Sequence, residues 1–216
     1  MFSWDEKSIK WFSQSANQTD FHKKIANEIL KFVDNNSSLL SLGSGLGYLD
    51  RALAPSFNSM TLVDNDDFAI DFLEKNKLKN QKIIKSDWKE LNIKSDYLLL
   101  SFFSRMYIND TLDDLLKLTN KKIFYLVNER HCDERDIIKY LCDKGVSFCF
   151  KHLRLNFDQY LKKSEIDDYI NHYYSKASEK KINNLLNQIE EIDVDNVVFR
   201  NKKKLIFIII DKGDLN

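Results

Sequence analysis

Proline and glycine are scarce in this sequence: Pro55 is the only proline among 216 residues, and glycine occurs five times. Collagen-like chains and low-complexity disordered chains are rich in these residues, so both classes are excluded. A surplus of either charge is also absent, since Lys+Arg and Asp+Glu number 33 each. Proteins that bind nucleic acid or anionic membranes usually carry a basic surplus, and the balance therefore argues against both kinds of partner.

Cysteine is scarce as well, and long apolar runs are missing. The three cysteines, Cys132, Cys142 and Cys149, are odd in number and form no C-x-x-C pair. This pattern argues against a disulfide framework or a metal site, and it favours a reducing cytoplasm. Charges are scattered through the N-terminal segment, so we expect no signal peptide. The longest apolar run, residues 205–210, is far shorter than the roughly 20 residues that a membrane span needs.

What the sequence does contain is an alternation of short apolar runs with segments of helical periodicity. The runs that we interpret as strands are residues 39–42, 60–63, 82–84, 97–103, 123–127, 146–150 and 204–210. Helical spacing of apolar residues precedes the first run and separates most of the others, and Gly145 is placed to end one such helix. Strands that alternate with helices are typical of a parallel, doubly wound sheet.

The segment between the sixth and seventh expected strands departs from this alternation. A capping-box pattern at residues 164–167 precedes apolar residues at helical spacing, and a second helical pattern covers residues 182–189. We therefore expect one domain, residues 1–216. Its parts are a helical leader (1–36), a cofactor-binding core (37–152), a mainly helical insertion (153–201) and a last strand with a tail (202–216).

The strongest motif is a glycine cluster after the first strand, where Gly43, Gly45 and Gly47 form Gly-x-Gly-x-Gly before a helix. Glycine is required where the backbone turns sharply and approaches a ligand closely, and the helix start offers free N–H groups. Nicotinamide enzymes usually carry G-x-G-x-x-G, but Tyr48 occupies the place of the third glycine here. The alternative interpretation is an ordinary glycine-rich turn.

An acidic residue follows at a characteristic distance. Asp64 ends the second strand 21 positions after Gly43, a spacing that brings a carboxylate to a ribose diol in dinucleotide-binding folds. A carboxylate accepts hydrogen bonds from two hydroxyls at once. The alternative is that Asp64 or Asp66 only caps the next helix; both roles are compatible if Asn65 or Asp66 is the cap.

Together these residues resemble motif I and the later motifs of class I S-adenosylmethionine-dependent methyltransferases, over roughly residues 20–150 and the last strand. The resemblance implies a three-layer α/β/α sandwich with a seven-stranded, mostly parallel sheet whose last strand is antiparallel. It also implies S-adenosylmethionine as the cofactor, with Ser44 and the three glycines around its amino-acid part. The family often has Glu or Asp where this chain has Ser41, whose hydroxyl accepts a hydrogen bond from an ammonium but brings no charge.

The resemblance assigns further residues to the cofactor. It places Asp64 and Asn65 at the ribose, Asp87 at the adenine amino group and Trp88 against the adenine ring. Ser101 would contact the cofactor at the end of the fourth strand. The following residues, Phe102, Phe103 and Ser104, would line the methyl-transfer pocket, although the alternative is that both Phe side chains are core.

Methyl transfer is an in-line displacement, and it needs a base only when the acceptor must lose a proton early. His131 is the best candidate because it follows the fifth strand at the ligand-binding edge, with a solvated loop histidine as the alternative. His22, beside lysines on a helix, is interpreted as a surface residue. The Asn/Asp-Pro-Pro-Tyr motif of adenine-N6 enzymes and the Pro-Cys of cytosine-C5 enzymes are absent, since Ser56 follows Pro55.

Aromatic residues in the leader and the insertion suggest a small-molecule acceptor, with Trp11, Tyr173 and Arg154 as candidate substrate contacts. The alternative is that aromatic residues at helical spacing are packing residues. The sequence thus predicts methyl transfer to a small molecule by a cytoplasmic monomer or homodimer, without metal, nucleic acid or membrane. A methyltransferase-like binding or partner subunit that has lost catalysis is the alternative.

Overall fold

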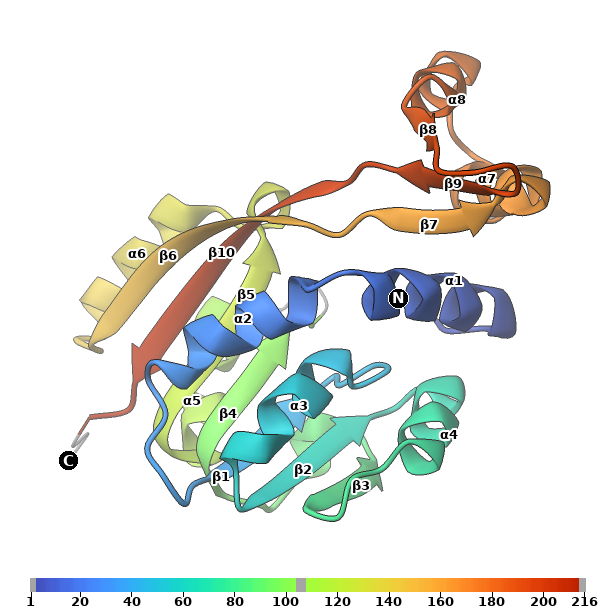
Figure 1. Cartoon of the computed structure of the whole chain (residues 1–216). Coiled ribbons are helices and arrows are strands. Elements are labelled where there is room, and N and C mark those ends of the chain that lie inside the picture. Colours follow the sequence, from blue (N-terminus) through green and yellow to red (C-terminus); the bar gives the residue numbers. More distant parts are fainter. Residues whose placement is uncertain (1–2, 104–107, 214–216) are drawn as a thin grey trace. The chain divides into compact units, whose positions relative to one another are not determined.

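The structure is a computed structural model that describes residues 3–103 and 108–213, apart from the side chain of residue 109 (Figure 1). The chain divides into two compact units. The first, called the core unit below, comprises Met1–Trp4, His22–Arg154 and Lys204–Asn216. The second unit comprises Asp5–Phe21 and Leu155–Lys203. The second unit therefore combines most of the expected insertion with the first half of the expected leader. The expectation that residues 1–216 form one domain stays a prediction.

A seven-stranded sheet forms the core unit, in the order β3-β2-β1-β4-β5-β10-β6. Neighbouring strands from β3 to β5 pair in parallel, and β10 pairs antiparallel with β5, as predicted. The strands are β1 (Ser38–Leu42), β2 (Ser59–Asp64), β3 (Gln81–Lys85), β4 (Ser95–Ser101), β5 (Thr119–Asn128), β6 (Phe148–Asn156) and β10 (Lys202–Asp211). Apolar residues of β1, β4, β5 and β10 are buried, as expected for strands that are covered on both faces.

Helices cover both faces of this sheet, and the core unit therefore has the predicted three layers (Figure 1). α5 and α6 pack on one face, where Leu112 and Ile137 join Leu40 and Leu98 in one apolar cluster. α2 and α3 lie on the opposite face in Figure 1. The helices are α2 (Phe21–Leu30), α3 (Tyr48–Leu53), α4 (Asp67–Lys75), α5 (Ile108–Lys117) and α6 (Glu134–Asp143), with short 3-10 turns η1 (Ala54–Ser56), η2 (Trp88–Glu90) and η3 (Glu129–His131).

Local signals in the sequence explain where several helices begin and end. Asp66 caps α4 by accepting a hydrogen bond from the Ala69 N–H at 3.0 Å. The predicted stop at Gly145 is confirmed: the residue has φ +69° directly after α6, and its N–H donates to the Cys142 carbonyl at 3.0 Å. β4 ends at Ser101, two residues earlier than predicted, because Phe102 adopts φ +54° and so leaves the strand conformation.

The second unit differs from the mainly helical insertion that the sequence predicts. It contains a three-stranded antiparallel sheet in the order β7-β9-β8. Trp11 of α1 packs with Leu161, Val197 and Phe199 in a small apolar core. The elements of this unit are α1 (Glu6–Gln18), β7 (Gln159–Lys162), η4 (Lys163–Glu165), α7 (Ile166–Tyr174), α8 (Glu179–Leu186), β8 (Ile189–Glu191) and β9 (Asn196–Phe199).

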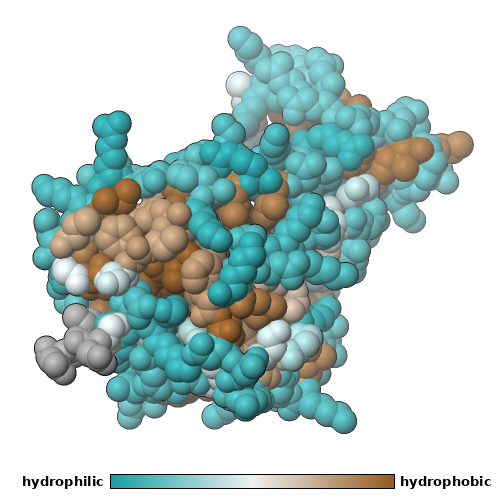
Figure 2. Space-filling view, turned by 60° about the vertical axis from the view of Figure 1, so that its left-hand side comes forward, coloured by the Kyte–Doolittle hydropathy of each residue, from teal (hydrophilic) through white to brown (hydrophobic). Residues whose placement is uncertain are grey.

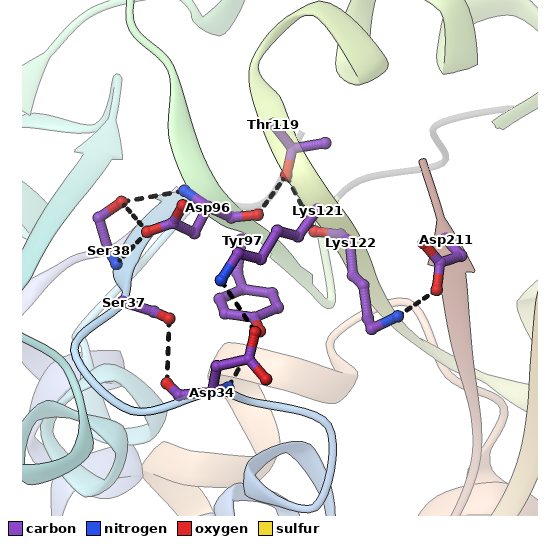
Figure 3. Close-up of polar contacts among 9 residues, drawn as sticks. All are labelled: Asp34, Ser37, Ser38, Asp96, Tyr97, Thr119, Lys121, Lys122 and Asp211. Carbon is purple, nitrogen blue, oxygen red and sulfur yellow. Dashed lines mark hydrogen bonds and ion pairs between the residues drawn. The ribbon is translucent and has the colours of Figure 1, made fainter. Parts of the chain in front are cut away.

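Polar contacts tie together the amino ends of the central strands (Figure 3). The Tyr97 hydroxyl accepts from the Asp34 N–H and donates to the Asp34 carboxylate, both at 3.0 Å. Ser38 at the start of β1 donates its N–H and its hydroxyl to Asp96, at 2.8 and 2.9 Å. Lys122 pairs with Asp211 across β5 and β10. This edge is therefore held by satisfied polar groups, which leaves the opposite edge, with its loops, for a ligand.

The visible surface is mostly hydrophilic, with apolar residues in separate patches (Figure 2). Within the described parts of the chain, no helix combines the length and apolar character that crossing a bilayer requires.

Candidate functional site

The glycine loop joins β1 to α3 at the carboxyl edge of the sheet. Gly43 and Gly47 have φ +63° and +65°, a conformation that residues with a side chain rarely adopt. A Cβ at Gly43 would lie 2.1 Å from the Phe103 ring, and one at Gly47 would lie 2.5 Å from Leu73 Cδ2. Both positions thus favour glycine for conformation, and at Gly43 the Phe103 ring also occupies the space that a side chain would need.

Asp64 holds this loop from the end of β2. Its Oδ2 atom accepts a hydrogen bond from the Gly45 N–H at 2.7 Å, and its Oδ1 atom accepts from the N–H groups of Asn65 and Asp66 at 2.8 and 3.0 Å. Because a carboxylate has about four acceptor positions, one more donor fits, on Oδ2. Asp66 rather than Asp64 caps α4, so the carboxylate of Asp64 is committed to the loop.

Asp87 and Trp88 lie at the end of the neighbouring strand β3. Ser86, the first residue after β3, donates its N–H to the Asp64 carbonyl at 3.1 Å. This hydrogen bond extends the pairing of β2 with β3 beyond the end of β3. Asp87 is exposed and caps η2 through the Lys89 N–H at 2.9 Å. Trp88 is half-buried against the apolar cluster of the core unit. The strand order therefore places the glycine loop, Asp64 and Asp87 in sequence along one edge.

Trp4 is close to the glycine loop, a position that the sequence did not predict. Its indole would lie 3.4 Å from a Cβ at Gly45, and the backbone N–H of Trp4 donates to Asp66 Oδ2 at 3.0 Å. Ser3 donates its hydroxyl to the same Asp66 oxygen, also at 3.0 Å. The helix cap of α4 thus also fixes the start of the described chain beside the loop.

The end of β4 presents two phenylalanines differently. Phe103 is half-buried, and its ring lies against Gly43. Phe102 is 41% exposed and has φ +54°, a strained conformation for a residue with a large side chain. Ser101 is half-buried at the last position of β4, paired with Leu126. The predicted role of Ser104 falls outside the described residues.

Asp50 is a charged residue of the site that sequence reasoning missed. It lies in the first turn of α3, is 1% exposed, and its Oδ1 atom has no hydrogen-bond partner. Burial raises the pKa of Asp50 to about 6, the hydrogen bond from Ser41 lowers it, and the charge of Asp64 raises it. A buried carboxylate beside the predicted loop residues makes the site more acidic than the motif alone indicates. The only signal in the sequence is its position three residues after Gly47.

The predicted base and the predicted arginine lie on the rim of the core unit. His131 is exposed in η3. Arg154 is half-exposed and pairs with Glu129, with 2.8 Å between Nη2 and Oε1, so its charge is already engaged. His22 is not the surface residue that the sequence suggests. It stacks on Tyr48, with ring centroids 5.6 Å apart, and burial lowers the pKa of His22 to about 4.

The other two candidate substrate residues belong to the second unit. Trp11 is 2% exposed and packs against Tyr173, with 5.9 Å between the two ring centroids. Packing therefore accounts for Trp11, in line with the alternative that the sequence left open. Tyr173 is partly exposed, and burial of its hydroxyl raises its pKa to about 12. Roles of both residues toward a substrate stay predictions. Across the described residues, no group of His, Cys, Asp or Glu is arranged to hold a metal ion.

Comparison with known proteins shows a structural likeness without a sequence relative. No protein-family model matches the chain, and no curated protein matches it. Magnesium protoporphyrin IX methyltransferase from Synechocystis PCC 6803, crystallised with bound S-adenosylmethionine, is 12% identical, with a TM-score of 0.57 over 97% of this chain and 86% of that chain. Precorrin-6y C5,15-methyltransferase from Geobacter metallireducens GS-15 is 7% identical, with a TM-score of 0.56 over 88% and 87% of the two chains.

A third similar structure has a different type of acceptor in its name. It is a candidate RNA methyltransferase from Pyrococcus horikoshii, 15% identical, with a TM-score of 0.53 over 88% of this chain and 80% of that chain. At these identities the likeness establishes the fold. The chain has the α/β fold of class I S-adenosylmethionine-dependent methyltransferases, as predicted.

Proposed function

We propose that this protein binds S-adenosylmethionine at the glycine loop and transfers its methyl group to a small-molecule acceptor. The observation that carries the proposal is the loop itself: three glycines at positive φ, where a side chain is strained, held in place by the carboxylate of Asp64. Such a loop lets a ligand approach the backbone closely, and an acid at the end of the next strand suits a ribose hydroxyl.

The order of the strands supports an assignment of residues to the parts of this cofactor. Trp88 and Asp87, after β3, would hold the adenine, whose amino group donates to a carboxylate. Asp64 and Asn65, after β2, would hold the ribose, with the second acceptor position of Asp64 Oδ2 for a hydroxyl. The amino-acid part would then lie toward β1 and β4, near Ser41, Ser44 and Ser101. When bound, the cofactor supplies an activated methyl group, and the protein's own task is positioning and exclusion of water.

Phe102 and Phe103 would line the side from which the acceptor approaches. Phe102 is held exposed by a strained backbone, and such strain is found disproportionately at ligand-binding positions. His131, at the end of β5, would accept a proton from acceptors that must lose one. The balanced charge of the chain favours a small molecule over RNA, although one similar structure carries an RNA methyltransferase name.

A partner subunit without catalysis is the second candidate function, and Ser41 in place of an acid is the observation that favours it. Methyl transfer to small-molecule pools, measured with labelled S-adenosylmethionine, separates the two. Tight cofactor binding without transfer to small molecules or to RNA supports the partner subunit.

The cofactor assignment is tested by calorimetric titration of the purified chain with S-adenosylhomocysteine. We expect Asp64→Ala and Asp87→Ala to weaken binding at least about tenfold, because each removes a charged hydrogen-bond acceptor. Asp114→Ala is the matched control, since this exposed carboxylate on α5 pairs with its helix neighbour Lys117, at 2.6 Å. A wild-type chain that does not bind, or variants that bind as the wild type does, would overturn the assignment.

A further inference from the structure

Asp50 is an unusual polar group among the described residues of the core unit. Its side chain is almost completely buried, and its Oδ1 atom has no hydrogen-bond partner. A buried carboxylate with an unmatched oxygen is costly, so a native structure that keeps one usually has a use for it. The other contact of this carboxyl is the Ser41 hydroxyl, at the position where the glycine motif lacks an acid. The acidic group that β1 lacks is therefore supplied from α3.

The surroundings of Asp50 provide negative charge but no positive charge. Burial raises the pKa of Asp50 most, and the charge of Asp64, at the end of β2, raises it further. Ser41 from β1 faces Asp50 with a neutral hydroxyl, and Leu73 from α4 approaches the adjoining Gly47 with an apolar side chain. Among the described groups, no cation acts on this carboxyl. Two acids in one small region favour a ligand with a positive group, because attraction is strong where water is excluded.

The position of Asp50 identifies which positive group that is. Its Oδ2 atom would lie 3.9 Å from a Cβ at Gly47, so the carboxyl is directly behind the glycine loop. The identity of the positive group rests on the proposed cofactor function. With the adenine at β3 and the ribose at β2, the strand order β3-β2-β1-β4 extends the amino-acid part toward β1, where Ser41 and Asp50 meet.

We propose that the Asp50 carboxylate is the negative charge with which the ammonium group of the cofactor's amino-acid part pairs, and that Ser41 orients this carboxylate. Binding then ionises Asp50, because a positive neighbour favours the charged form of an acid. The proton that Asp50 loses goes to solvent, so binding is accompanied by proton release when the free protein carries that proton.

Two ligands that differ in the ammonium group test the pairing. S-adenosylhomocysteine has the amino-acid part, whereas 5′-methylthioadenosine keeps the adenine, ribose and thioether but has no ammonium. Asp50→Asn removes the charge and preserves the size of the side chain. We expect this variant to bind S-adenosylhomocysteine about 10- to 100-fold more weakly, and methylthioadenosine within about twofold of the wild type. Asp114→Asn, which removes an exposed charge, should change neither affinity.

Proton release provides a second, independent readout. Titrations with S-adenosylhomocysteine at pH 6, in buffers of different ionisation enthalpy, should give about half a proton more release for the wild type than for Asp50→Asn. At pH 8 the difference should vanish, because Asp50 is then ionised before the ligand binds.

The outcomes are distinguishable. Weaker binding of S-adenosylhomocysteine alone, with the extra proton release, supports the pairing. Equal weakening of both ligands means that Asp50 only shapes the loop, and unchanged binding of both means that it plays no part; either result overturns the proposal. A wild-type chain that binds neither ligand overturns the proposed cofactor function itself, and this inference with it.

Discussion

Replacing Asp50 by Asn should change the pH dependence of stability in a direction that is unusual for an acid. Most acidic side chains have a lowered pKa in the folded state and stabilise the fold at neutral pH. Asp50 is the opposite case, because burial raises its pKa from 3.8 to about 6. Between these two values the folded state holds a proton that the unfolded state has lost, so the contribution of Asp50 to stability falls as the pH rises.

The magnitude follows from the two pKa values. Their separation corresponds to about 3 kcal/mol of penalty on the folded state once the pH is well above 6. At pH 4.5 about 1 kcal/mol of that penalty persists, since Asp50 is then protonated in the folded state and mostly ionised in the unfolded state. Relative to the wild type, Asp50→Asn should thus gain about 2 kcal/mol in unfolding free energy between pH 4.5 and pH 8.

Urea denaturation of the wild type and of Asp50→Asn at the two pH values measures this difference. Any effect of the amide that is the same at both pH values cancels in the comparison. Asp211→Asn is an informative control. Burial raises the pKa of Asp211, but the ion pair with Lys122 and the Gly213 N–H lower it more, so the net pKa is below its ordinary value. Because both pH values lie above the ordinary pKa of 3.8, the stabilising contribution of Asp211 is almost fully present at both, and Asp211→Asn should lose nearly the same stability at pH 8 as at pH 4.5. A pH dependence of Asp50→Asn no larger than that of Asp211→Asn would contradict the raised pKa of Asp50.

Two further predictions concern backbone conformation. Gly43→Ala and Gly145→Ala both place a side chain at positive φ, which costs about 1–2 kcal/mol, but only the Cβ at Gly43 meets Phe103, and open space surrounds Gly145. In denaturation and ligand titration, Gly43→Ala should lose more stability and should no longer bind S-adenosylhomocysteine; equal losses would contradict the close approach. The unfolding free energy of Phe102→Gly should be about 1 kcal/mol higher than that of Phe102→Ala, because only glycine adopts φ +54° without strain. Asn36, at φ +62°, allows the same comparison of alanine and glycine variants away from the site. If the alanine variant is as stable as the glycine variant at both positions, the backbone there is not strained.

The sheet was predictable because each of its strands is a buried apolar run between turn or helix signals. The small strands of the second unit were not, since β7, β8 and β9 have only four, three and four residues. Such lengths are too short for an alternating pattern to be distinguished from the helical spacing around them. The antiparallel pairing of β7 with β9 depends on partners 34 to 40 positions apart, such as Gln159 and Phe199, and local propensity does not encode it.

At the site, the glycine loop and Asp64 were predictable because spacing alone relates them. Asp50 was not, because a carboxylate next to Arg51 in a helix usually faces water. Asp50 instead lies in the interior beside Gly47, with Oδ2 3.9 Å from the place where a Cβ would be. Only the three-dimensional packing turns a charged helix position into an interior one.

The construction of the second unit from two distant segments has a consequence for synthesis on the ribosome. α1 is among the first elements to emerge, yet the Gln159 side chain that donates to the Trp11 carbonyl follows 148 residues later. At roughly 5–20 residues per second, Trp11 waits on the order of ten seconds for its partners. During that time an apolar helix face is open to chaperones or to other nascent chains. A chain that stops before β7 would leave this face permanently uncovered, and it would also lack β10, the strand between β5 and β6 in the sheet, so we expect such truncated chains to aggregate.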